Sequence, residues 1–277
     1  LLNASFGVVA QIALGFGAVM VLLGLGLMTS IIMTITRFYR FKLERHHGSY
    51  HISHGLIEGH ERTLAHQKIQ CFKLQQSITG EWVRRYMGKV IQAGTAFGEG
   101  GFNKRSRSEI IPGLRADAAL NFEKDLYPKF DRQQIRPTPV LKHYAYYLIR
   151  LWALVALIPA SIFVLNGYWS GLVFLGLPLI AAPLCFRAQR NRRFGFNDDF
   201  GIVTGGVLTR WRVLFPLYKV QNVKLTQSIF QKRRERANLH IALAGETLYI
   251  PYIPLKTANR LRDLLLYRIE TSNKRWM

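Results

Sequence analysis

The sequence predicts an α+β fold with transmembrane helices, in which two small β-sheet modules alternate with membrane-spanning helices. Each module is expected to be capped by a C-terminal helix. Two observations lead to this prediction. Residues 1–36 and 151–186 contain no charged side chain, whereas the segments that follow them are strongly basic. The two basic segments also share a motif at a constant spacing of 151 residues, which indicates that one module occurs twice.

Uncharged apolar stretches of 18 or more residues are transmembrane candidates. Ala10–Ile35 forms the first, within a predicted membrane segment at 1–36. A helical hairpin is expected at 143–187, with one span at Leu148–Leu165, a turn at 166–171 and a return at Leu172–Phe186 that two prolines kink. The turn contains Tyr168 and Trp169, which suit a membrane interface.

Positively charged residues near the span ends predict the orientation. They flank the apolar stretches on one side only, at Arg37, Arg40, Lys42, Arg45, Lys142, Arg187, Arg190, Arg192 and Arg193. Both modules should therefore face the cytoplasm, and the uncharged turn and Leu1 should lie outside. Because the chain begins at Leu1 rather than Met, we expect it to be a fragment with room for further copies upstream.

The repeated motif is the most specific feature of the chain. Residues 68–78 and 219–229 are identical at seven of eleven positions. Upstream of the motif, Gly55 aligns with Gly206 at the same spacing of 151 residues. The motif residues considered further are Lys68, Gln70, Gln76, Ser77, Lys219, Gln221, Gln227 and Ser228. Their recurrence favours a structural role, such as pairing backbone groups at a β-bulge, and leaves a shared recognition role open.

Each module begins with short strands broken by glycine, at Tyr50–Ser53 and Gly201–Thr204. Further strands are expected at the motif, at 89–93 and 239–244, and at 247–250. A helical pattern ends each module, opened by Pro112 in the first copy and by Pro254 in the second. The modules are expected to span 43–128 and 194–270.

The order Gly–apolar–apolar, Lys-Val/Ile-Gln, Leu-x-Gln-Ser and then Ala-Gly resembles the bacterial pleckstrin-homology-like (PH-like) membrane protein family of the YdbS/YdbT type. The first copy departs from it by about nine extra residues between Ala93-Gly94 and Ile111-Pro112. The resemblance implies a small barrel-like sheet capped by a helix, the bacterial plasma (inner) membrane as location, and no catalytic residues. It also implies a partner with similar domains and a link to antimicrobial-peptide resistance.

Basic clusters in the two copies are candidate contacts for anionic lipid. They are Lys104, Arg105 and Arg107 in a glycine-rich loop of the first copy and Lys232, Arg233 and Arg234 in the second. A flexible strand connection is the simpler interpretation of the first loop. Each basic residue near an anionic surface contributes about 1 kcal/mol. The formal charge of +22 is explained by cytoplasmic loops, and without a nucleic-acid-binding motif we expect no nucleic acid partner.

Six of the eight histidines fall between residues 46 and 66. They are His46, His47, His51, His54, His60 and His66. A polar sheet face near the membrane is the simpler interpretation, since their spacing matches no metal-ligand pattern. A pH-sensitive surface and a bound metal are the alternatives.

The sequence therefore predicts a protein that is not an enzyme, without cofactor or metal, which presents two cytoplasmic modules to anionic lipid or to protein partners. The resemblance favours a membrane-anchored scaffold that acts in cell-envelope stress, and the expected partners include a second copy of the chain in a homo-oligomer. The alternative is an accessory subunit of a transporter or export complex. Against this alternative, residues 1–36 and 151–186 of the spans contain no charged side chain that would line a transport path.

Overall fold

The structure is a computed structural model that describes residues 2–46, 48–56, 59–93 and 107–272. It divides into two compact units, Leu1–His66 and Gln67–Met277. The boundary follows the third strand of the first copy. The predicted extent of that module, 43–128, therefore stays a prediction.

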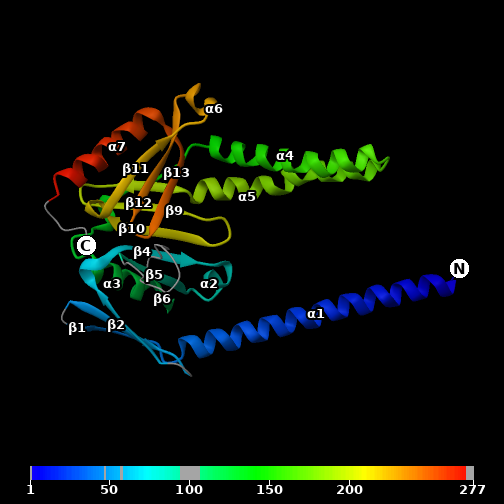
Figure 1. Cartoon of the computed structure of the whole chain (residues 1–277), viewed down its shortest axis with the longest axis horizontal. Coiled ribbons are helices and arrows are strands. Elements are labelled where there is room, and N and C mark those ends of the chain that lie inside the picture. Colours follow the sequence, from blue (N-terminus) through cyan, green and yellow to red (C-terminus); the bar gives the residue numbers. More distant parts are fainter. Residues whose placement is uncertain (1, 47, 57–58, 94–106, 273–277) are drawn as a thin grey trace, which may run out of the picture. The chain divides into compact units, whose positions relative to one another are not determined.

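The first unit consists of a long helix and a three-stranded antiparallel sheet (Figure 1). Helix α1 (Leu2–Phe38) is followed by β1 (Lys42–His46), β2 (Ser49–His54) and β3 (His60–Ala65), in the order β1-β2-β3. The Nδ1 atom of His54 lies 2.9 Å from the carbonyl oxygen of Arg37. This contact ties the end of β2 to the end of α1.

The second unit contains a seven-stranded sheet that combines strands from both copies. Its strands are β4 (Ile69–Gln76), β5 (Tyr86–Gln92), β6 (Arg107–Leu114), β7 (Thr138–Pro139), β8 (Arg193–Phe196), β9 (Phe200–Gly205) and β10 (Arg210–Pro216). The spatial order is β6-β5-β4-β10-β9-β8-β7. Strand β4 of the first copy pairs antiparallel with β10 of the second, with Phe72 opposite Leu214 and Gln76 opposite Arg210. The separate small sheet predicted for each copy is therefore wrong in this respect.

The remaining strands form a three-stranded sheet that the C-terminal helix covers. Strands β11 (Val220–Thr226), β12 (Arg236–Leu243) and β13 (Glu246–Pro254) follow one another in space. Helix α7 (Leu255–Glu270) lies on this sheet (Figure 1) and buries Ala258 and Leu265 in the core. The helix begins directly after Pro254, its N-cap residue, so Pro254 opens this helix as the sequence predicted.

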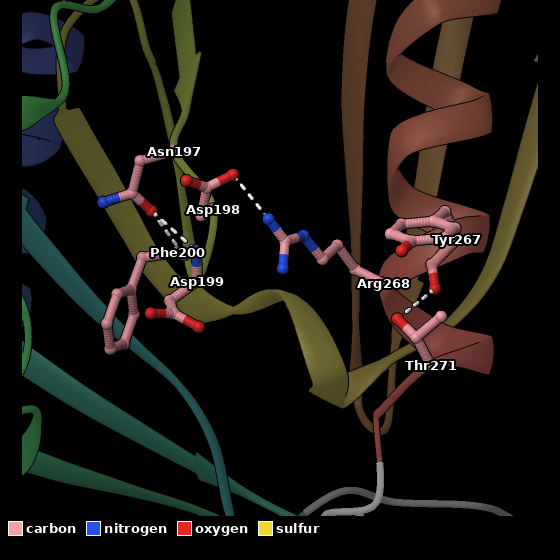
Figure 2. A network of polar contacts seen from close by, with 7 residues as sticks. All are labelled: Asn197, Asp198, Asp199, Phe200, Tyr267, Arg268 and Thr271. Carbon is pink, nitrogen blue, oxygen red and sulfur yellow. Dashed lines mark hydrogen bonds and ion pairs between the residues drawn. The ribbon is translucent and has the colours of Figure 1, made fainter.

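Figure 2 shows how the loop between β8 and β9 is held against α7. The Asn197 side chain accepts hydrogen bonds from the backbone N–H groups of Asp199 and Phe200, at 3.0 and 2.6 Å. Such a local side-chain turn fixes a sharp reversal of the chain. The neighbouring Asp198 then forms an ion pair of 2.5 Å with Arg268 of α7.

The described residues contain three helical segments long and apolar enough to cross a membrane, at Leu14–Phe38, His143–Leu165 and Trp169–Asn191. Helices α4 (His143–Leu165) and α5 (Leu177–Asn191) lie side by side (Figure 1). The return was predicted as one stretch from Leu172. It instead begins with the 3-10 helix η3 (Trp169–Gly176), and Pro178 stands in the first turn of α5, where a missing N–H costs no hydrogen bond.

The order of elements recurs at the spacing of the sequence motif. Subtracting 151 from the bounds of β9, 200–205, gives 49–54, which are the bounds of β2. The 3-10 helices η1 (His66–Lys68) and η4 (Leu217–Lys219) correspond in the same way, as do the short helices α2 (Ile78–Trp82) and α6 (Ile229–Lys232). Backbone geometry recurs as well, because Gly55 and Gly206 have φ of 124° and 103°.

The predicted bulge occurs at equivalent positions in both copies. The pairing register shifts between Ile69 and Cys71 in β4 and between Val220 and Asn222 in β11. Gln70 and Gln221 are the residues at these shifts. The spacing of apolar residues in the motif therefore reports a real irregularity of the strand.

Pro112 does not open a helix, contrary to the sequence prediction. It lies within β6, and helix α3 (Ala116–Leu126) begins after the N-cap residue Arg115. Arg115 is therefore the counterpart of Pro254, 139 residues later. The earlier strands of the two copies are related by 151 residues. The difference between 151 and 139 means that the first copy contains about twelve extra residues before its helix, rather than the nine expected from sequence. The error arose because two Ile-Pro pairs stand in the second copy, at 250–251 and 253–254.

An ion pair connects α3 to β10. Arg212 donates to the carboxylate of Glu123, whose side chain is only 3% exposed. Burial lowers the pKa of Arg212, and the charge of Glu123 opposes this effect. Breaking such a pair from one side leaves a buried charge without its partner.

We expect Glu123→Ala to lower the free energy of unfolding by about 3 kcal/mol, because the Arg212 guanidinium stays buried. Thermal unfolding in detergent measures this change. The control Asp117→Ala removes an exposed carboxylate from the same helix and should cost less than about 1 kcal/mol. The combination of Glu123→Leu with Arg212→Met should recover most of the loss. Equal effects of the two single alanine variants would contradict this role.

Cys71 is fully buried in a core cluster with Val213 and Phe215 of β10. Burial raises the pKa of its thiol, and the negative charge of Glu246 adds to the rise. Because the thiolate is the reactive form, we expect Cys71 to resist a maleimide at pH 7.5 until denaturant opens the β4–β10 pairing. Intact-mass analysis with peptide mapping follows the labelling. Modification of the folded chain within minutes would contradict this packing.

Candidate anion site beside the membrane helices

A cavity of about 680 Å³ lies within the second unit, between the first turns of α4 and the α6–β12 region. Its wall combines cationic, aromatic and aliphatic side chains. The lining residues are His143, Tyr146, Tyr147, Arg150, Leu151, Leu154, Ser228, Phe230, Gln231, Arg234, Arg236 and Tyr252. A concave site with a few converging polar groups is the usual form of a ligand site.

Helix α6 forms one side of the cavity, and local sequence fixes where it begins. Ser228 is its N-cap residue and accepts a hydrogen bond from the backbone N–H of Gln231 at 3.3 Å. The Gln231 side chain accepts in return from the backbone N–H of Ser228 at 3.0 Å. This reciprocal capping box, Ser followed three residues later by Gln, is readable from sequence. Neither α6 nor its counterpart α2 was predicted.

Asn238 of β12 holds α6 against the sheet. Its side-chain oxygen accepts from Gln231 Nε2 at 2.8 Å and from the backbone N–H of Tyr252 at 3.0 Å. Tyr252 adopts a φ of +51°, an unfavourable backbone conformation for a residue with a side chain. The hydrogen bond from Tyr252 to Asn238 helps to hold this conformation, and with it the tyrosine ring at the cavity.

Two buried nitrogen atoms at the cavity are not satisfied by any group that the structure describes. Arg236 donates through Nη2 to Nε2 of His143 at 3.0 Å. Neither the Nη1 of Arg236 nor the Nδ1 of His143 has a hydrogen-bond partner among the described residues. Buried donors that lack a partner are costly, so their presence at a cavity favours an anionic ligand.

Three arginines of the cavity influence the pKa of Tyr252, which lines the same cavity. Burial raises the pKa of its phenol. The positive charges of Arg150, Arg236 and Arg234 all oppose this rise. The cavity therefore concentrates positive charge beside an apolar and aromatic wall.

The end of α6 is apolar as well as basic. Ile229 and Phe230 are 75% and 76% exposed, and Lys232 and Arg233 follow with exposed side chains. Exposed apolar residues beside cations are typical of a helix that lies in a membrane interface. The first copy has a similar end at α2, where Trp82 is 83% exposed.

A second cavity of about 400 Å³ lies at the β4–β10 pairing. Five arginines line it, namely Arg132, Arg190, Arg193, Arg210 and Arg212. Two of them already have carboxylate partners, because Arg210 contacts Glu81 at 3.3 Å and Arg212 pairs with Glu123. The cavity at Arg236 is the better candidate for binding an anion, because it also contains the two buried nitrogen atoms of Arg236 and His143 that have no partner among the described residues.

The structure places the predicted lipid contacts differently in the two copies. Lys104 and Arg105 lie outside the described residues, and only the backbone of Arg107, the first residue of β6, is described. In the second copy Arg234 lines the cavity, while Lys232 and Arg233 stay exposed at the end of α6. The structure thus brings one of the three basic residues of the second cluster into the cavity.

The repeated motif residues take local positions. Ser77 and Ser228 are the N-cap residues of α2 and α6, and Gln70 and Gln221 stand at the bulges. Gln227 donates to the carbonyl oxygen of Arg236 at 2.6 Å. Gln76 lies opposite Arg210, and Lys68 and Lys219 end η1 and η4. The capping serines and bulge glutamines fit the structural role.

Sequence reasoning missed several cavity residues, including His143, Arg150 and Tyr252. Arg150 carried a signal, because it is a lone charge inside an apolar helix, where charges are rare and functional. His143 and Tyr252 carried none. They meet only after β13 returns to the start of α4, where Tyr147 and Tyr252 have ring centroids 5.5 Å apart.

The histidine-rich segment lies on the sheet of the first unit. The His46 and His51 ring centroids are 5.5 Å apart, as are those of His54 and His60. His47 lies outside the described residues. Among the described residues, no group of three or more His, Cys, Asp or Glu is arranged to hold a metal ion.

We expect Asn238→Ala to loosen α6 selectively, because it removes acceptors from Gln231 and from the Tyr252 N–H. A lost partner of this kind costs about 1–3 kcal/mol. Amide hydrogen exchange in residues 229–236 should rise, while the exchange of β9 and β10 stays unchanged. The control Asn222→Ala lies exposed on β11. Faster exchange throughout the second unit would mean global destabilisation instead.

Comparisons with known proteins identify similarities for part and for most of the chain. A family model described as a bacterial PH domain matches residues 150–269, which include the second copy and not the first. The chain is 23% identical over 235 residues to the UPF0699 transmembrane protein YdbT of Bacillus subtilis (strain 168). That similarity covers 82% of the chain and 46% of YdbT, so the chain spans about half the length of this curated relative. The chain is therefore a membrane protein with a bacterial PH domain at residues 150–269, and it is similar to YdbT over most of its length.

Proposed function

We propose that the chain is a membrane-anchored binding protein whose bacterial PH domain holds an anionic phospholipid head group at the inner leaflet. The observation that carries this proposal is the convergence of Arg150, Arg234 and Arg236 on one cavity next to α4. Arginine suits phosphate oxygens because its donors form a planar fork.

The position of the cavity supports a lipid rather than a free phosphate. Arg150 lies two turns inside α4, a candidate membrane span, and Leu151 and Leu154 line the same cavity. A head group could meet the arginines while its acyl chains follow α4. The exposed Ile229 and Phe230 would enter the interface beside it.

This function requires the second copy to face the cytoplasm, as the basic flanks of the spans predict. It requires no bond-breaking step, so the protein acts by binding, as a scaffold or a sensor of inner-leaflet charge. A role in envelope stress or antimicrobial-peptide resistance would follow if such peptides changed that charge.

The test measures phosphatidylglycerol binding to the full chain in mild detergent by native mass spectrometry. Combining Arg150→Gln, Arg234→Gln and Arg236→Gln should weaken binding roughly 100-fold, at about 1 kcal/mol for each basic residue. Phosphatidylcholine, which has no net charge, should bind weakly to both forms.

The matched control combines Lys129→Gln, Lys256→Gln and Arg260→Gln, which removes three exposed positive charges elsewhere. It should keep most of the affinity. If both triple variants lose affinity equally, net charge rather than the cavity is responsible and the proposal fails. Tight binding of inorganic phosphate would identify a soluble anion instead of a lipid.

A further inference from the structure

The pairing of β4 with β10 has a counterpart in the same chain, which the sheets formed by the described residues do not contain. The strand equivalent to β4 is β11, and the strand equivalent to β10 is β3, both by the spacing of 151. Strand β3 ends the sheet β1-β2-β3, and β11 ends the sheet β11-β12-β13. Both β3 and β11 are therefore edge strands, whereas their counterparts β10 and β4 pair with each other.

Burial differs between the equivalent strands accordingly. Cys71 of β4 is 0% exposed, whereas its counterpart Asn222 in β11 is exposed. Val213 of β10 is 0% exposed, whereas its counterpart Arg62 in β3 is exposed. The side chains at each edge have changed with their surroundings, from apolar in the covered strand to polar in the edge strand.

The ion pair across the covered junction has a counterpart with exchanged signs. Helices α3 and α7 are related by 139 residues, since the buried Ala119 and Leu126 correspond to the buried Ala258 and Leu265. Glu123 therefore corresponds to Arg262, and Arg212, by the spacing of 151, corresponds to Glu61. A β3–β11 junction would pair Glu61 with Arg262 where the β4–β10 junction pairs Arg212 with Glu123.

The exchange of signs also selects between pairings. A β3–β4 pairing would bring Glu61 next to Glu123. A β10–β11 pairing would bring Arg212 next to Arg262. Like charges at these positions disfavour both. The repeated lysine fits the same scheme, because Lys219 donates to the carbonyl oxygen of Gln67 at 2.5 Å. Lys68, its exposed counterpart, would donate to the carbonyl oxygen of Tyr218.

We infer that a second copy of this chain docks by strand addition, with β3 of one copy antiparallel to β11 of the next. The β4–β10 register transfers directly. It places His60 opposite Thr226, Glu61 opposite Leu225 and Arg62 opposite Lys224. The contact is heterologous, because each copy contributes a different surface, so repetition closes a ring or extends a chain of copies.

Disulfide cross-linking between two populations tests the register. Full-length chains with Arg62→Cys and with Lys224→Cys are purified separately with tags of different size, mixed in detergent and oxidised. Directly opposite residues lie about 4.5–5.5 Å apart, within reach of a disulfide. The mixed dimer should form several-fold faster than either dimer of one variant alone.

The matched control mixes Arg62→Cys with Val223→Cys, which is one residue out of register and points to the opposite face. It should cross-link at least tenfold more slowly. Absence of the mixed dimer, or equal rates for the two mixtures, would overturn the inference.

Charge exchange tests the specificity. Glu61→Arg and Arg262→Glu should each weaken association roughly tenfold, as judged by light scattering of the purified chain. Their combination in one chain should restore it. Lys224→Glu should strengthen association, because it replaces a like charge opposite Arg62.

A wild-type chain that stays monomeric at tens of micromolar, or a combined variant that fails to regain association, would overturn the inference. So would a monomeric chain whose residue 62 cross-links in membranes to a different protein. Lipid binding is measured separately, so a failure of self-association leaves the proposed function unaffected.

Discussion

The antiparallel pairing of β4 with β10 is the constraint on which the second unit depends. It joins strands from two copies of the motif into one sheet and brings α3 against β10. It also buries Cys71 in a core that the second copy supplies. The ion pair between Lys73 of β4 and Glu246 of β13, at 2.6 Å, joins the seven-stranded sheet to the three-stranded one. The bacterial PH domain is therefore stabilised partly by residues outside the matched range.

Local features of this chain could be predicted from its sequence because they depend on neighbouring residues. The spans follow from charge-free stretches, the bulges from the spacing of Ile69, Phe72 and Leu74, and the last helix from Pro254. The capping box at Ser228 was equally local and could have revealed α6. The resemblance of the second motif to the bacterial PH-like family agrees with the match of a bacterial PH domain model to residues 150–269.

Features that depend on distant contacts could not be predicted. Strand β4 pairs with a strand far along the chain. Its residues Leu74 and Gln75 lie opposite Arg212 and Trp211, which are 138 and 136 residues later. No periodicity encodes such a choice. The cavity has the same origin, because His143, Arg150, Arg236 and Tyr252 come from three separate elements. Pro112 was misplaced because its Ile-Pro pair corresponds to Ile250-Pro251 of the second copy and not to Ile253-Pro254, a choice that the sequence leaves open.

The prolines of the edge strands have a consequence for solubility during synthesis. Pro112 stands in β6, Pro139 in β7 and Pro251 in β13, and each strand lies at the end of its sheet. A proline lacks the N–H that a continuous ladder needs, so these edges resist growth into aggregates. Newly made chains crowded on one membrane are thereby protected at these three edges, and ordered contacts can form elsewhere.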